Sequence, residues 1–192
     1  MPPLIVCGLL LLVLCSSVRG DEPRLVLNVD GPNSRIRGLA FSNDSQRLYC
    51  GGFSKVVNVW DVGWNLPPGA DGDLLATSIA TLRWEIARAL RGQINALDLA
   101  PTGHRLAVAG TGARDANGTI VVFDTDRNEV LAGLPPEYKP DVRSGHVSSV
   151  ISLDFSPSGN RLVSVSLDGE AWLWTANGDA ADEWVGRLLR PA

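Results

Sequence analysis

Short runs of alternating apolar and polar residues, separated by turn residues, recur along this chain. The clearest set lies in residues 145–174, GHVSSVISLDFSPSGNRLVSVSLDGEAWLW. Residues 150–155 and 161–166 alternate, as half-buried β-strands do, and residues 171–174 form a third, aromatic-rich run. The turns between them, Ser-Pro-Ser-Gly and Leu-Asp-Gly, are short enough to fix the register of two hairpins. This stretch therefore predicts three strands of an antiparallel sheet.

The same pattern predicts further strands in the rest of the chain. The segment 74–90 is ambiguous, because it lacks Gly and Pro and a helix would fit it. However, Leu82, Trp84 and Ile86 alternate with polar residues and the arrangement needs a fourth strand there, so we expect a strand. Residues 62–73 are rich in Gly and Pro and predict a loop. The other expected strands are 24–29, 36–41, 47–51, 55–60, 94–99, 105–109, 119–124, 129–134 and 183–189.

An internal repeat organises these strands. Three fragments superpose residue by residue: FSNDSQRL from Phe41, LAPTGHRL from Leu99 and FSPSGNRL from Phe155. In each copy the third strand ends in an aromatic residue, at Trp60, Phe123 and Trp174 respectively. The second copy has extra residues, all in the loop near 111–116. Three copies in register, with an insertion confined to one loop, predict three similar sheets.

The Gly145-His146 start, the Trp60-Asp61 dipeptide and the strand-end Trp174 resemble the repeats of the WD-repeat β-propeller family. The resemblance covers about 25–189 and implies an all-β fold, a partial β-propeller of three four-stranded antiparallel blades at about 24–90, 91–144 and 145–192. The repeat interval is longer than the roughly 40–45 residues usual for the family, and loop insertions account for the difference. A closed propeller needs about four to eight blades. We therefore expect either that the chain is the front of a longer propeller or that chains associate to complete a ring.

The resemblance also gives a structural role to His146, Ser164, Asp168 and Trp174. In WD repeats these positions form a hydrogen-bonded tetrad, in which the His before the first strand bonds the Asp of the second turn and Ser and Trp complete the chain. A Ser, a His and an Asp also suggest a hydrolase triad. No Gly-x-Ser-x-Gly sequence surrounds Ser164, so the structural interpretation is favoured. The other copies depart from the tetrad: Phe123 replaces Trp in the second, and Ser54 replaces Asp and Pro32 replaces His in the first.

The first 20 residues stand apart from the strand pattern. Residues 4–14 are an apolar run too short to span a bilayer, and Val18 and Gly20 are the small residues of a cleavage site. We expect a signal peptide at 1–20, a mature chain at 21–192 and an exported protein, secreted, periplasmic or at the cell surface, with no stable membrane insertion after cleavage. Cleavage would remove Cys7 and Cys15 and leave Cys50, so we expect no internal disulfide.

Charge and candidate chemistry narrow the function. The formal net charge of -4 gives no basic field for nucleic acid. The sequence has no cluster of His with Cys, no Gly-rich phosphate loop and no setting for a nucleophilic Cys. The Asp residues of 71–73 and 179–182 suit solvated turns better than a Ca²⁺ loop. We therefore expect no catalytic residues, no metal ligands and no cofactor.

The resemblance implies a non-enzymatic scaffold that binds a protein or peptide through one face of the propeller. The alternative is a targeting or substrate-presenting module of a larger exported enzyme, with its catalytic part beyond residue 192. In the family, the turns between strands two and three share a face with the linkers between blades. The partner-binding residues expected on this face are Arg114, Tyr138, Lys139 and Arg143, because exposed Tyr and Arg are favoured anchors. Blade faces without a neighbour also lead us to expect self-association.

Overall fold

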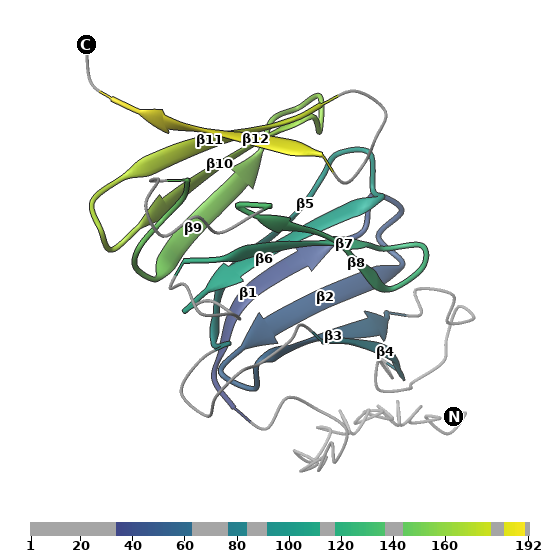
Figure 1. Ribbon diagram of the computed structural model, residues 1–192. Coiled ribbons are helices and arrows are strands. Elements are labelled where there is room, and N and C mark those ends of the chain that lie inside the picture. Colours follow the sequence, from purple (N-terminus) through teal and green to yellow (C-terminus); the bar gives the residue numbers. More distant parts are fainter. Residues whose placement is uncertain are drawn as a thin grey trace, which may run out of the picture.

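The computed structural model describes residues 34–62, 77–83, 92–111, 118–136, 144–177 and 183–190. This part of the chain is all-β and forms three four-stranded antiparallel sheets (Figure 1). In each sheet the strands pair in sequence order. The strands are β1 (Ile36–Phe41), β2 (Arg47–Gly52), β3 (Val56–Asp61), β4 (Thr77–Arg83), β5 (Ile94–Leu99), β6 (Arg105–Gly110), β7 (Ile120–Asp124), β8 (Glu129–Leu134), β9 (Val150–Phe155), β10 (Arg161–Ser166), β11 (Ala171–Ala176) and β12 (Trp184–Leu189).

The prediction of three four-stranded antiparallel sheets is confirmed for the described residues. The ambiguous segment contains a strand, β4, which pairs with β3. The prediction for β11 ended two residues early, because Thr175 and Ala176 continue the pairing with Val185 and Trp184. The expected strand 24–29 and the expected signal peptide lie outside the described residues.

The sheet β5–β8 lies between the other two, and apolar side chains fill both junctions (Figure 1). The first junction joins buried residues of β2, β3 and β4 to buried residues of β5, β6 and β7. The second joins the opposite face of β5–β8 to the face of the third sheet that carries Trp172, Trp174 and Trp184. Because side chains alternate between the two faces of a strand, the middle sheet supplies apolar residues to both cores.

The first strands of the three sheets contact one another, β1 with β5 and β5 with β9. Two glycines allow this close approach at the first junction. A Cβ on Gly38 would lie 2.9 Å from Leu97 Cγ, and a Cβ on Gly51 would lie 3.1 Å from side-chain atoms of Ile94 and Leu97. Hydrogen bonds also cross the second junction. Asn95 Nδ2 donates to Val150 O at 3.0 Å, and Phe155 N donates to Asp98 Oδ2 at 2.7 Å.

The repeat extends to the backbone conformation of the turns. The same position of the first turn is left-handed in all three sheets, and it is occupied by Ser45 (φ 59), Gly103 (φ 82) and Gly159 (φ 70). The same position of the second turn is occupied by Lys55 (φ 66), Gly118 (φ 82) and Gly169 (φ 80). Glycine adopts this conformation without steric cost, whereas L side chains rarely do. The first sheet therefore keeps the turn geometry of the repeat with less suitable residues.

Candidate functional site

Hydrogen bonds link three of the four predicted tetrad residues in the third sheet. His146 precedes β9, Ser164 lies on β10 and Trp174 lies on β11. Trp174 Nε1 donates to Ser164 Oγ at 2.9 Å, and Ser164 Oγ lies 2.8 Å from His146 Nε2. Since the serine oxygen accepts from the indole, its own proton is free to go to His146 Nε2, which leaves the imidazole proton on Nδ1.

Asp168 completes the group from the turn between β10 and β11. Its Oδ2 lies 3.4 Å from His146 Nδ1 and accepts from Val147 N at 2.9 Å, while its Oδ1 accepts from Glu170 N at 3.0 Å. The 3.4 Å separation is too long for a normal hydrogen bond, and His146 Nδ1 has no other partner in the described structure. The carboxylate thus bridges the segment before β9 to the β10–β11 turn.

Burial sets the protonation of this group. Burial lowers the pKa of His146 and outweighs the Asp168 carboxylate beside it, which raises it. Burial alone would raise the pKa of Asp168, but the backbone N–H groups of Val147 and Glu170, together with His146, lower it. The favoured state is therefore a neutral imidazole next to an ionised carboxylate.

The order Ser–His–Asp matches the connectivity of a hydrolase triad, in which Nε2 faces the serine and Nδ1 faces the carboxylate. A nucleophile, however, must reach a substrate. Ser164 has 0% of its surface exposed, and its oxygen is already bonded to the indole of Trp174. This arrangement can hold together β10, β11 and the segment before β9.

The first sheet contains a counterpart that the sequence analysis missed. Cys50 and Trp60 take the positions of Ser164 and Trp174 in the repeat. Trp60 Nε1 donates to Cys50 Sγ at 3.2 Å, and both residues are buried. Burial raises the pKa of the Cys50 thiol. The superposed repeats contained the signal, because they align Cys50 with the serine.

The middle sheet replaces this pair with apolar residues. Val108 occupies the serine position and Phe123 the aromatic position, at 0% and 2% exposure. Removing both partners of a buried hydrogen bond leaves no unsatisfied group, so the cost is small when the shapes fit. The three sheets therefore use three versions of one packing site.

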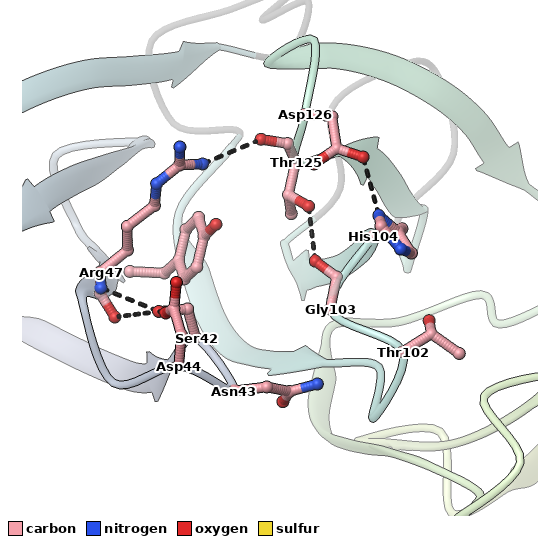
Figure 2. A pocket seen from close by; sticks show the side chains of 10 residues that line it. Ser42, Asn43, Asp44, Arg47, Thr102, Gly103, His104, Thr125 and Asp126 are labelled. Atoms are coloured by element: carbon pink, nitrogen blue, oxygen red, sulfur yellow. Dashed lines mark hydrogen bonds and ion pairs between the residues drawn. The ribbon is translucent and has the colours of Figure 1, made fainter.

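A second candidate site is a cleft of about 250 Å³ between the first two sheets. It lies where the β1–β2 turn meets the β5–β6 and β7–β8 turns (Figure 2). Arg47 Nη1 reaches Thr125 O at 3.5 Å, and Thr125 Oγ1 donates to Gly103 O at 2.6 Å. The side chain of Asn43 also donates to Pro101 O. These bonds tie the two sheets together around the cleft.

Charged groups of both signs surround the cleft. His104 Nδ1 and Asp126 Oδ2 are 2.7 Å apart, and both side chains are exposed. The Ser42 hydroxyl and the Gln46 N–H lower the pKa of Asp44. The floor contains Tyr49, which is 1% exposed. The cleft therefore offers a buried phenol group, a guanidinium and carboxylates to a ligand.

The four predicted partner-binding residues lie outside the described residues. They are Arg114, Tyr138, Lys139 and Arg143. Among the described side chains, no group of three or more His, Cys, Asp or Glu is placed to hold a metal ion. The same residues contain no helix with the length and apolar character needed to span a bilayer.

Comparison with known families identifies repeats in two regions of the chain. The model of the WD domain, G-beta repeat, matches residues 23–61 and 139–175. These regions contain β1, β2 and β3 of the first sheet and β9, β10 and most of β11 of the third sheet. The chain therefore carries WD repeats in these two regions. The middle repeat of the chain lies between the matched regions and is the one with Val108 and Phe123 in the packing site.

The relatives that the chain matches are WD-repeat proteins. The chain is 23% identical over 168 residues to target of rapamycin complex subunit LST8 of Bos taurus, an alignment covering 86% of this chain and 42% of that protein. The LST8 of Mus musculus is 22% identical over the same length. The WD repeat-containing protein 91 homolog of Dictyostelium discoideum is 25% identical over 175 residues, 73% of this chain and 21% of that protein. The chain thus spans less than half the length of these curated relatives.

Proposed function

We propose that this WD-repeat chain is a non-enzymatic scaffold that binds a protein or peptide. WD-repeat relatives act as interaction scaffolds, and one relative is by name a subunit of a complex. The observation that carries the proposal for this chain is the cleft between its first two sheets, with Tyr49 on its floor. The comparisons lend no support to the alternative of a module of an exported enzyme.

The size and polarity of the cleft favour a peptide. At about 250 Å³ it is smaller than the pockets that usually hold drug-sized ligands, roughly 300–1,000 Å³. It is suited to a side chain or turn of a larger partner. Exposed Tyr and Arg are frequent anchors of such contacts. Arg47 is exposed, and within the described part of the chain its guanidinium makes one long bond, to Thr125 O, which leaves other N–H donors for a partner.

Selection from a display library of random peptides tests this function. Peptides enriched on the purified chain would be synthesised, and their Kd measured by fluorescence anisotropy. We expect Arg47→Ala and His104→Ala to raise the Kd about tenfold or more, which is about 1.4 kcal/mol. The matched control is Arg161→Ala, because Arg161 begins β10 as Arg47 begins β2 but does not line the cleft. A library that yields no binder above bare beads would refute the scaffold proposal.

The same assay compares the two candidate surfaces. Sequence resemblance favours the segments that contain Arg114, Tyr138, Lys139 and Arg143, whereas the cleft lies among the first and third turns of the sheets. If Tyr138→Ala and Arg143→Ala weaken binding more than Arg47→Ala and His104→Ala, the partner uses the predicted loops and the cleft is not its site. The scaffold function would then stand with its surface reassigned.

We also propose the remaining finer assignments as part of this function. His146, Ser164, Asp168 and Trp174 act as a structural tetrad rather than as a catalytic group, which the burial of Ser164 supports. The three sheets act as consecutive blades of a propeller, and the contacts between β1, β5 and β9 support this arrangement. We also propose that this scaffold self-associates, because its first and last described sheets each have one uncovered face. Export remains a proposal that rests on the sequence.

A further inference from the structure

One face of the first sheet has the residues of a buried face but lies uncovered. Three residues of β1 and β2 define this leading face: Leu39, Phe41 and Leu48. Their repeat equivalents are Leu97, Leu99 and Leu106 in the second sheet and Leu153, Phe155 and Leu162 in the third. All six equivalents are buried at a sheet junction. In contrast, Leu39 is 61% exposed and Phe41 is 52% exposed.

The third sheet has the complementary feature. Its trailing face, which points away from the second sheet, is defined by Val163, Leu173 and Leu189. The repeat equivalents are Tyr49, Val59 and Leu82 in the first sheet and Ala107, Val122 and Leu134 in the second. These six residues are at most 1% exposed. Leu189, by comparison, is 43% exposed, and Val163 and Leu173 are only partly buried.

The two junctions within the chain show which faces pair. At each one the trailing face of a sheet packs on the leading face of the next sheet. The described chain therefore has one uncovered face of each kind, the leading face of the first sheet and the trailing face of the third. Uncovered apolar patches of this kind usually mark an interface.

A polar group supports the same pairing. Asp98 lies on the trailing side of the second sheet and accepts from Phe155 N of the third sheet at 2.7 Å. Asp154 takes the position of Asp98 in the third sheet and is exposed. Phe41 takes the position of Phe155. A sheet docked on the third one as the third is docked on the second would place Phe41 N within reach of Asp154.

We propose that the occupant of both faces is a second copy of this chain, joined head to tail. The trailing face of each copy covers the leading face of the other, with Asp154 accepting from Phe41 N across each junction. The described residues of two copies supply six sheets, within the range of about four to eight blades in closed propellers. A head-to-tail contact forms a closed ring when its rotation closes, and here two identical contacts close it. Arg187, which replaces Ala80 and Ala132, would lay its aliphatic stem across the junction and keep its charge at the rim.

Light scattering coupled to size-exclusion chromatography of the full chain tests the proposal. We expect a mass twice that of the chain measured by mass spectrometry. Leu39→Lys and Leu189→Lys should each shift the mass to that of a monomer. Leu167→Lys is the matched control, because this leucine is 68% exposed in the β10–β11 turn, away from both faces. Circular dichroism of each variant checks that the sheets remain folded.

Mixing the two variants tests the head-to-tail direction. Each variant keeps one intact face, so an equal mixture of Leu39→Lys and Leu189→Lys should form a dimer through the single intact junction. Asp154→Asn should weaken the wild-type dimer, measured as a higher dissociation constant, without unfolding it. A dimer that survives Leu189→Lys, or a mixture that stays monomeric, would overturn the head-to-tail arrangement. A monomeric wild type would overturn the proposal itself and assign the leading face to another segment of the same chain. Open oligomers of more than two copies would overturn the closed ring.

Discussion

Transplanting the apolar packing site of the middle sheet into the third sheet would test what the buried network contributes. The change is the triple substitution His146→Leu, Ser164→Val and Trp174→Phe. Two of these residues copy Val108 and Phe123, and Leu90 stands at the position of His146 in the repeat. The single substitution Ser164→Val leaves the Trp174 Nε1–H and His146 Nε2 without partners in a buried site.

The expected free energies follow from the number of groups left unpaired. An unsatisfied buried group costs roughly 1–3 kcal/mol, so Ser164→Val, with two such groups, should lose about 2–6 kcal/mol of the free energy of unfolding. His146→Leu removes the acceptor of the Ser164 proton, and Trp174→Phe removes one bond of about 1 kcal/mol. The triple variant leaves no member of the network unpaired except Asp168, which keeps its backbone bonds to Val147 and Glu170. We therefore expect the triple variant to lose at least about 2 kcal/mol less than the sum of the three single losses.

Urea unfolding of the wild type, the three single variants and the triple variant measures these differences, with the free energy extrapolated linearly to water. If Ser164→Val proves too unstable to purify, Ser164→Ala provides the same loss of hydrogen bonds with less crowding. The double variant His146→Ala with Ser164→Ala should likewise cost less than its two parts. If the loss in the triple variant equals the sum of the three single losses, the coupling is refuted, because substitutions at residues that do not share a network are additive. A hydrolase activity abolished by Ser164→Ala, with unchanged stability, would instead restore the catalytic interpretation.

Three further predictions concern pH, packing and processing. Burial lowers the pKa of His146 in the folded state. Below about pH 6.5 the unfolded state therefore takes up a proton that the folded state does not, and the melting temperature should fall from neutral pH towards pH 5. This fall should be smaller in His146→Gln. Gly186→Ala places a Cβ 2.5 Å from Cζ3 of buried Trp174 and should cost about 1–3 kcal/mol in urea unfolding, whereas Gly133→Ala, with nothing within 4 Å, should not. Mass spectrometry of the protein from its native host should find Asp21 as the first residue, and an intact Met1 would contradict the export prediction.

The sequence predicted the sheets well because the hydrophobic pattern and the turn residues agree with each other. Alternation located the strands, and the superposed repeats placed the β5–β6 and β9–β10 turns around Gly103 and Gly159. The fourth strand of the first sheet was expected within 74–90 and lies at 77–83, but of the three alternating residues used only Leu82 belongs to it, and Trp84 and Ile86 lie outside the described residues. Strand ends were less accurate, because Thr175 and Ala176 carry little hydrophobic signal and are held in β11 by pairing with β12.

Contacts between sheets could not be predicted in the same way. The cleft depends on turns that are 58 residues apart, as in the bond from Asn43 to Pro101 O. The bond from Phe155 N to Asp98 joins residues 57 apart along the chain. Neither residue type nor spacing identifies such partners, because they meet only once the sheets are stacked. Cys50 is different, since the repeat alignment already placed it opposite Ser164 and only its chemistry was overlooked.

The three versions of the packing site follow the surroundings of each sheet. The middle sheet is covered on both faces, so Val108 and Phe123 are held by apolar contacts on every side and need no hydrogen bonds. The third sheet is covered on one face only, and there a network from Trp174 to Asp168 fixes the turn that apolar contacts would otherwise hold. Directional hydrogen bonds, such as those from Trp174 to Ser164 and from Val147 N to Asp168, specify one arrangement more strictly than apolar packing does. Because Ser164 and Trp174 lie on the face of the third sheet that packs on the second sheet, the network fixes the segment before β9 and the β10–β11 turn at the edge of that junction.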